Sequence, residues 1–321
     1  MERVVCNLCG SAQQTTVYEI PDTRFFPDEC FTVVECDNCG LGFVNPRPSF
    51  AEIAKYYPRE YYQAQPTPDF HRYLMRRFAA EARYLGEIEN RPGPRKLLDV
   101  GCWNGDFPRF MKARGWDVQG VEVSNASERI TDFPVYTQEF QDIPVAEPTF
   151  DAVTAWAVLE HVHDPMAYFR KAARVLKKDG RFVFLVTNFH SMASRYLFGE
   201  DIPRHLYFFT RETVRQYLEK AGMLLECEDN GRSVYKMAPA NWLTYLLQTR
   251  LRGKPFNYKD VPLSSRAFRS KHGLSKGIGT SWKYAAYSPA SVVERLFMPA
   301  VEAAQILRKT YGISTYVARK A

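Results

Sequence analysis

The feature that most constrains the fold is an apolar segment that ends in an acidic residue and a glycine-bearing turn. Residues 96–105 read KLLDVGCWNG, so Asp99 stands at the end of the apolar run, and Gly101 and Gly105 follow it. A strand that enters such a turn, with a helix leaving it, is typical of α/β proteins. We therefore expect a central sheet whose first strand ends at this turn.

Strand and helix patterns alternate from this turn to residue 221. We predict strands at residues 117–123, 135–138, 150–156 and 180–187, helices at 106–114, 164–177 and 211–221, and a final strand at 313–319. This order predicts a parallel, doubly wound sheet. Ligands of such sheets bind beyond the carboxyl ends of the strands, where the strand order reverses.

Four of the seven cysteines form two Cys-x-x-Cys-Gly pairs, namely Cys6, Cys9, Cys36 and Cys39. Four thiolates complete the tetrahedral coordination of Zn²⁺ and leave no open position. The glycine after each pair lets the backbone turn so that amides face the sulfurs. Two coincidental pairs or a redox dithiol are the alternatives. We predict a structural zinc ribbon over residues 1–46.

Composition excludes several classes of protein. The chain has 321 residues, of which 45% are apolar, and its formal net charge is +7. No apolar run is long enough for a membrane span, and the first residues lack the apolar region of a secretory signal. The odd cysteine count and the paired thiols favour a reducing, cytoplasmic compartment over a disulfide-stapled secreted chain.

Two acidic residues indicate which ligand the turn binds. The spacing from Gly101 to Gly105 differs from the G-x-G-x-x-G that cradles a dinucleotide pyrophosphate. The Asp99 carboxylate suits the cationic amino group of an amino-acid tail. Glu122, at the end of the next strand, can accept hydrogen bonds from both hydroxyls of a ribose. Asp99 could instead cap the next helix, and Glu122 could be a solvated strand end. Together they favour an adenosyl cofactor.

These residues resemble motif I of the class I S-adenosylmethionine-dependent methyltransferases. Residues 150–162, 175–181 and 205–210 resemble later elements of the same family. The resemblance implies a Rossmann-like fold, S-adenosylmethionine as cofactor and methyl transfer. Many members have glycine where Trp103 stands, so Trp103 must take a permissive backbone angle or point its ring away. The implied cofactor-binding residues are Asp99, Gly101, Cys102, Gly105, Glu122, Phe140 and Trp156.

The ribbon and the Asn45-Pro46-Arg47-Pro48 linker resemble the subgroup with an amino-terminal zinc ribbon. Small-molecule, sugar and lipid-linked acceptors are common in that subgroup. We expect a helical linker at residues 47–94 and a cofactor-binding domain at 95–235 plus 312–321. Residues 236–311 then form an inserted lid or substrate region, with amphipathic helices at 242–251 and 292–307.

Three histidines, His161, His163 and His205, are candidate bases for the acceptor proton. His205 follows the fifth predicted strand, where acceptors sit in related folds, so it is our candidate catalytic residue. A structural histidine bonded to a carbonyl is the alternative. We expect His161 to shape the pocket. The motifs for methylating nucleobase amines or cytosine carbon are absent, which disfavours those acceptors.

The stretch 250–283 carries nine basic residues against one acid. It fits a solvated lid, a site for an anionic acceptor, or a peripheral contact with an anionic membrane surface. We therefore predict a methyltransferase that acts on a hydroxyl of a small molecule, sugar or lipid-linked glycan. The alternative is an RNA methyltransferase or RNA-binding module that uses the ribbon and the basic stretch.

Overall fold

The computed structural model describes residues 1–22, 24–58, 61, 68–197, 200–231, 234, 235, 237, 239, 242–251, 253 and 289–320. The basic stretch 250–283 therefore lies outside the described residues, apart from residues 250, 251 and 253. Interpretations of that stretch as a lid, an anion site or a membrane or RNA contact stay predictions.

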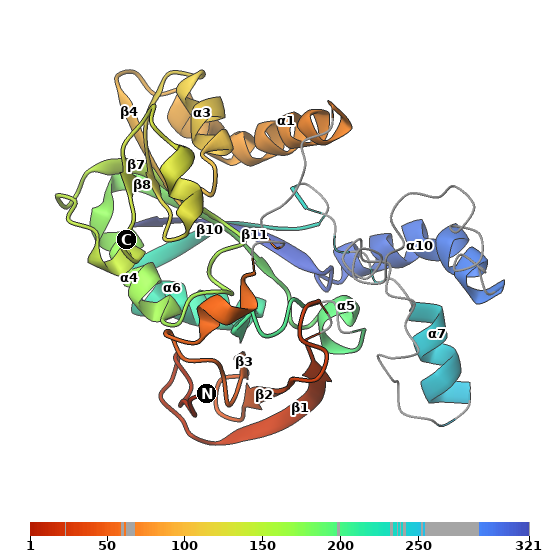
Figure 1. Cartoon of the computed structure of the whole chain (residues 1–321). Helices are drawn as coiled ribbons and strands as arrows, with labels where there is room; N and C mark the ends of the chain where they lie inside the picture. Colours follow the sequence, from red (N-terminus) through yellow and green to blue (C-terminus); the bar gives the residue numbers. More distant parts are fainter. Residues whose placement is uncertain are drawn as a thin grey trace.

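A seven-stranded sheet forms the centre of the molecule, with strand order β10-β11-β8-β7-β4-β5-β6 (Figure 1). Its strands are β4 (Arg95–Val100), β5 (Trp116–Val121), β6 (Val135–Tyr136), β7 (Phe150–Trp156), β8 (Leu176–Thr187), β10 (Met223–Asn230) and β11 (Ile313–Lys320). β4 pairs in parallel with both β5 and β7, so the strand order reverses there. The Rossmann-like, doubly wound sheet is confirmed.

The prediction of a parallel sheet is wrong at one edge. β11 runs antiparallel to β8 and to β10, which makes the sheet mixed. Asn230, at the end of β10, faces Ser314, near the start of β11. The segment between them therefore leaves and returns at the same end of the sheet, and β11 has to run back along its neighbours.

Helices cover both faces of the sheet, as Figure 1 shows. α1 (Pro68–Ala82), α2 (Gly86–Glu89) and α3 (Asp106–Lys112) belong to one side, and α4 (Pro165–Val175) and α6 (Arg211–Lys220) to the other. Successive strand residues point to opposite faces. Leu97 accordingly packs with Phe78 and Phe107, whereas Leu98 belongs to the core that contains Phe169.

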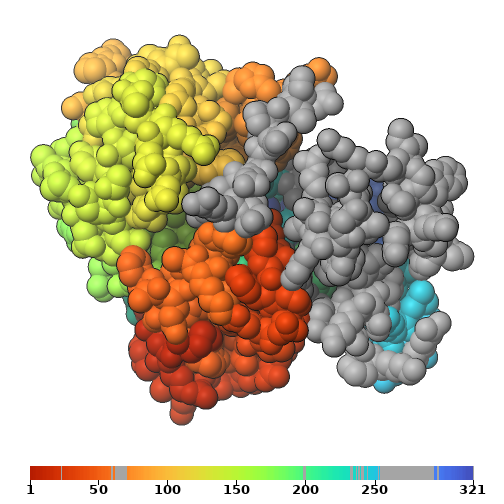
Figure 2. All heavy atoms as spheres, in the orientation of Figure 1, coloured from red at the N-terminus to blue at the C-terminus, as the bar shows by residue number. Residues whose placement is uncertain are grey.

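A second, four-stranded antiparallel sheet forms the N-terminal lobe. It contains β1 (Gln14–Pro21), β2 (Cys30–Cys36), β3 (Gly42–Val44) and β9 (Tyr207–Phe208). β9 comes from the loop after β8, and Phe43 pairs with Tyr207. Figure 2 shows this lobe, in red and orange, lying against the yellow-green body. The two parts share one apolar core, which includes Leu41 and Tyr217.

Among the described residues after β8, three helical segments remain besides α6. They are α5 (Met192–Arg195), α7 (Trp242–Leu246), which continues as a π-helical turn over Leu247–Leu251, and α10 (Pro289–Leu307). The Leu243 amide donates to the Glu294 carboxylate at 2.7 Å, which joins α7 to α10. Both helices lie away from the central sheet (Figure 1). None of the helices in the described part of the chain combines the length and apolar character needed to cross a bilayer.

Candidate cofactor, acceptor and metal sites

The turn after β4 requires glycine at two positions. Gly101 has a φ of 68°, and a Cβ there would lie 2.6 Å from a methyl of Val158. Gly105 begins α3 with a φ of 81°, and a Cβ there would lie 2.8 Å from the Phe133 ring. Trp103 has a φ of 48°, so the predicted permissive backbone angle is confirmed. Glycine-like backbone angles and close contacts together give the turn its shape.

Asp99 lies at the carboxyl end of β4 and is almost completely buried, with 3% of its surface exposed. The Thr154 hydroxyl donates to its Oδ1 atom at 2.6 Å. Burial outweighs this hydrogen bond and raises the pKa of Asp99 to about 8. The carboxyl group is therefore held at a strand tip in an environment that favours a cationic partner.

Glu122 follows β5, the parallel neighbour of β4, so it reaches the same end of the sheet as Asp99. Its two oxygens accept from the backbone amides of Trp103 and Ser124, each at 2.8 Å. The carboxylate thus ties the glycine turn to the second strand. The structure brings Asp99 and Glu122 together as the sequence predicts, and their contact with an adenosyl cofactor stays a prediction.

Sequence reasoning missed two charged residues of α1 near this tip. The Arg77 guanidinium pairs with the Glu81 carboxylate at 2.7 Å and lies 4.2 Å from the centre of the Tyr235 ring. Both charges act on the pKa of Asp99. The second oxygen of Glu81 is buried and has no hydrogen-bond partner among the described residues, and burial raises the pKa of Glu81 to about 7. The i, i+4 spacing of a basic and an acidic residue was the available signal.

The remaining residues that the sequence predicts to bind the cofactor lie inside the core. Cys102 is buried against Gly120. Phe140 is 1% exposed and meets the Tyr168 ring edge-on, with 5.4 Å between ring centres. Trp156 packs edge-on against Phe107, and its indole Nε1 has no hydrogen-bond partner in the described part of the chain. Their roles toward a cofactor stay predictions.

His205 lies in the loop before β9 and pairs with a carboxylate that sequence reasoning did not single out. Its Nδ1 lies 2.6 Å from Oε2 of Glu200, whose other oxygen accepts from the Ser194 hydroxyl. Burial lowers the pKa of His205, but the hydrogen bond and charge of Glu200 outweigh it and raise the pKa above its ordinary value. Glu200 therefore orients the imidazole and stabilises its protonated form.

The other two histidines have different partners. His161 Nδ1 lies 3.0 Å from both the Arg204 carbonyl and the Tyr57 hydroxyl. Burial and the neighbouring His205 lower the pKa of His161 to about 3. His163 contacts the Pro48 carbonyl through Nε2 at 3.1 Å. His205 is thus the histidine of the three that is paired with a carboxylate.

Glu160 lies in the loop between β7 and α4 and holds the loop that carries His205. Its carbonyl accepts from the amides of Leu206 and Tyr207, at 2.7 and 3.1 Å, which fixes the loop that carries His205. Burial raises the pKa of Tyr235, and the charges of Glu81 and Glu160 raise it further. Tyr235 is therefore within electrostatic reach of both the α1 acid and the histidine region.

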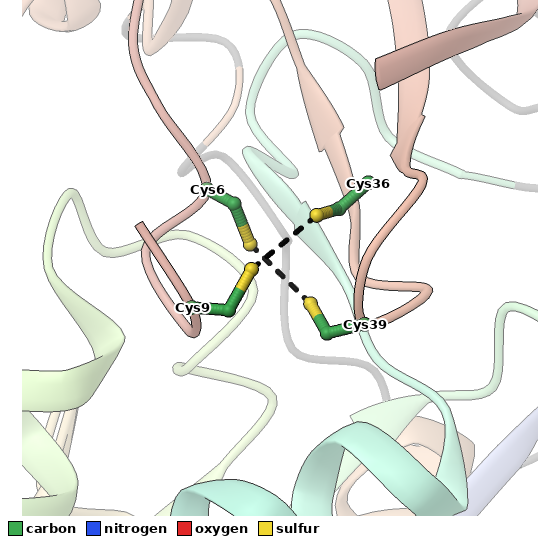
Figure 3. A group of neighbouring side chains, drawn as sticks. All are labelled: Cys6, Cys9, Cys36 and Cys39. Atoms are coloured by element: carbon green, nitrogen blue, oxygen red, sulfur yellow. Dashed lines mark hydrogen bonds between the residues drawn. The ribbon is translucent and has the colours of Figure 1, made fainter. Parts of the chain in front are cut away.

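The four N-terminal cysteines point toward a common centre, as Figure 3 shows. The Sγ atoms of Cys6 and Cys39, and those of Cys9 and Cys36, are each 3.5 Å apart, and all four lie within 4.8 Å. Tetrahedral Zn²⁺ with bonds of about 2.3 Å needs sulfurs about 3.8 Å apart. The contact with Cys39, together with backbone amides, lowers the pKa of Cys6 to about 5. The four thiols therefore fit Zn²⁺.

Comparison with known proteins identifies the central part of the chain. Residues 70–228 match a family model described as a methyltransferase domain. A ubiquinone biosynthesis O-methyltransferase from Alkalilimnicola ehrlichii is 34% identical over an alignment of 117 residues, and the match covers 33% of this chain and 46% of that protein. One from Acinetobacter baumannii is 35% identical, over 32% of this chain and 49% of that protein. The chain thus spans about half the length of the curated relatives it matches.

Solved structures show a more distant likeness. Geranyl diphosphate C-methyltransferase from Streptomyces coelicolor is 16% identical, with 76% of this chain and 78% of that chain covered and a TM-score of 0.46. An S-adenosylmethionine-dependent methyltransferase from Mesorhizobium loti is also 16% identical, with 75% of this chain and 97% of that chain covered and a TM-score of 0.41.

The segment matched by the family model runs from α1 into β10, so it contains Asp99, Glu122 and His205.

Proposed function

We propose that this chain, which contains a class I S-adenosylmethionine-dependent methyltransferase domain, methylates a hydroxyl oxygen of a small molecule with His205 as general base. The observation that carries the proposal is the 2.6 Å pairing of His205 with Glu200. A histidine held in this way can accept a proton at Nε2 while Nδ1–H stays bonded to the carboxylate. The name of the relatives, which specifies O-methylation, supports oxygen as the acceptor atom.

The residues at the tips of β4 and β5 fit the cofactor. When bound, S-adenosylmethionine supplies a methyl group on a positively charged sulfur. Asp99 would hold the cofactor's ammonium group, and Arg77 its carboxylate. Glu122 would accept from the ribose hydroxyls. The buried, unpartnered oxygen of Glu81 supports this assignment, because a cationic group there would satisfy it.

The work of the chain in this reaction is to position the acceptor and to move one proton. The acceptor oxygen must lie in line with the methyl–sulfur bond, and His205 must lie within hydrogen-bond reach of the hydroxyl. As the oxygen–carbon bond formed and the methyl–sulfur bond broke, the hydroxyl proton would pass to Nε2 of His205. Glu200, buried beside Nδ1, then stabilises the imidazolium cation.

Zn²⁺ in the Cys6–Cys9–Cys36–Cys39 cluster would have a structural role only. Four thiolates fill a tetrahedral zinc and leave no position for an acceptor. The cluster would stabilise the N-terminal sheet, which includes β9, the strand that begins two residues after His205. Zinc would thus support the loop that carries the proposed base.

Two acceptor classes follow from different observations. The ribbon-bearing subgroup favours a sugar or lipid-linked hydroxyl, and the relatives are named for ubiquinone biosynthesis. Both classes present a hydroxyl to the base. The membrane contact depends on the basic stretch 250–283, and the RNA alternative on that stretch and the ribbon. Apart from residues 250, 251 and 253, the stretch lies outside the described residues.

Labelled methyl transfer from S-adenosylmethionine tests the proposal, with catechol and a free hexose as acceptor probes. His205→Gln should lower kcat by about 10²- to 10⁴-fold, with the dissociation constant of S-adenosylmethionine unchanged. His163→Gln is the matched control and should keep the wild-type rate, because His163 bonds the Pro48 carbonyl instead. A wild-type rate in His205→Gln, or label recovered on carbon or nitrogen, would contradict the proposal.

A further inference from the structure

We propose that Glu160, His161 and His205 form a second metal site, which binds a divalent cation through two imidazoles and one carboxylate. One nitrogen of each histidine and one carboxylate oxygen of Glu160 lie within 4.8 Å of one another. Glu160 and His161 belong to the loop after β7, and His205 to the loop before β9. Two histidines and a carboxylate on one side of an ion form a common ligand set for divalent first-row metals.

His205 is oriented as a metal ligand would be. Its Nδ1 lies 2.6 Å from Glu200, whose side chain is fully buried. A carboxylate only accepts, so Nδ1 carries the hydrogen and the lone pair lies on Nε2. Histidine ligands of metals usually donate their other ring N–H to such a carboxylate, which fixes the ring and makes the ligand nitrogen more basic.

His161 is held in the same tautomer by a different partner. The Arg204 carbonyl lies 3.0 Å from Nδ1, and a carbonyl can only accept, so Nδ1 again carries the hydrogen. The Tyr57 hydroxyl, also 3.0 Å away, can share that donor. The two imidazole rings meet edge to face, with 4.6 Å between ring centres. Both rings thus keep an unprotonated Nε2 that can bind a metal ion.

Glu160 supplies the observation that points to a cation. It is 1% exposed, and its Oε2 atom is buried with no hydrogen-bond partner among the described residues. A buried carboxylate oxygen without a partner costs free energy unless a proton or a cation satisfies it. That residue stands next to His161, in the cluster that also contains His205.

The surrounding charges favour a cation. Arg204 is bonded to Asp22 and to Asp201, and Asp201 also pairs with Arg24 at 2.6 Å. These two guanidiniums are therefore already matched by two carboxylates, and Glu160 and Glu200 are two further acidic groups beside the histidines. Burial raises the pKa of Glu160 to about 7, so a divalent ion that binds there replaces a proton on part of the molecules at pH 7 and is then attracted by the ionised carboxylate.

The cation and a proton would compete for Nε2 of His205. An ion bound there would take the acceptor hydroxyl oxygen as a further ligand and lower the pKa of that hydroxyl, in place of proton uptake by the imidazole. Cation binding goes beyond the proposed function and can be measured without methyl transfer.

Mn²⁺ binding followed by electron paramagnetic resonance tests the site on the full chain, purified with Zn²⁺ in its cysteine cluster. Mn²⁺ binds thiolates more weakly than Zn²⁺ does, so it will not displace that zinc. We expect one strongly bound Mn²⁺ per chain. Glu160→Gln and His161→Gln should each weaken binding at least tenfold, and Glu200→Gln by about 10- to 100-fold, because it acts through His205.

His163→Gln and Glu139→Gln are the matched controls and should bind Mn²⁺ as the wild type does. His163 bonds the Pro48 carbonyl, and Glu139 is a carboxylate that accepts from the Tyr168 hydroxyl. No bound Mn²⁺ in the wild type, or wild-type affinity in Glu160→Gln and His161→Gln, would overturn the site. Cooperative thermal unfolding and retained S-adenosylmethionine binding show that each variant is folded. If one of the two ligand variants does not fold, the other decides.

Discussion

At the scale of single residues, the proposed cofactor site contains a carboxyl group, that of Asp99, which the fold keeps nearly free of water. Burial raises the pKa of Asp99 from its ordinary 3.8 to about 8. The neutral acid therefore predominates at pH 7 when no cation is bound. If Asp99 holds the cofactor's ammonium group as proposed, it has to do so as the carboxylate, and binding then expels a proton.

We predict that S-adenosylmethionine binding releases a proton near pH 7 and tightens about tenfold per pH unit up to pH 8. Titration calorimetry in two buffers of different ionisation enthalpy measures the proton count directly. Asp99→Asn should bind more weakly and lose most of this pH dependence. Equal heats in both buffers, with affinity constant from pH 6 to 8, would rule out this role for Asp99.

Sequence could identify Asp99 and Glu122 because each stands at the end of an apolar strand, and adjacent parallel strands bring their ends together. It could not identify Glu200 as the partner of His205. Nor could it single out Glu160, whose buried oxygen lacks a hydrogen-bond partner among the described residues, because a missing hydrogen bond is visible only in the folded chain. Such pairings arise from loop geometry, which has no periodic signal.

At the scale of elements, apolar runs predicted strands well where the strands are buried. β7 spans the predicted residues 150–156. The sequence did not predict β10, because the second half of this strand, ECEDN, is polar and most of its residues are at least partly exposed at the sheet edge. β9 has two residues and pairs with the N-terminal lobe, so no local pattern could reveal it.

The turn between β4 and α3 carries a prediction about backbone shape. Gly105→Ala places a Cβ 2.8 Å from the Phe133 ring at a φ of 81°. The variant should lose about 1–3 kcal/mol of unfolding free energy and bind S-adenosylmethionine more weakly, because the turn has to shift. Chemical denaturation and a binding titration measure the two effects.

Gly86→Ala is the control for that substitution. Gly86 lies in α2, and a Cβ there would meet nothing within 4 Å. Its helical conformation accepts alanine, so stability should stay the same or rise by about 0.5–1 kcal/mol. A Gly105→Ala protein as stable as Gly86→Ala would show that the turn tolerates a side chain.

At the scale of the whole molecule, the N-terminal lobe and the body built on the central sheet are joined by shared structure. β3 pairs with β9, and the Arg47 guanidinium donates to the Tyr207 hydroxyl at 2.8 Å and to the His163 carbonyl at 3.0 Å. Disturbing the cysteine cluster should therefore reach the loop that carries His205. A small sheet by itself buries little apolar surface, so the lobe depends on its contacts with the body and on the cysteine cluster for stability.

Cys39→Ser tests this connection, with Cys30→Ser as the matched control because Cys30 is exposed and outside the cluster. Cys39→Ser should lose bound zinc and lower Tm by about 5 °C or more. It should also reduce the rate of methyl transfer to the catechol or hexose probe. The affinity for S-adenosylmethionine should fall less than that rate, because the ends of β4 and β5 do not pair with β9. Metal analysis, calorimetry and the transfer assay measure these effects. A Cys39→Ser protein that loses zinc yet keeps the Tm and rate of Cys30→Ser would show that the body holds the His205 loop without the ribbon.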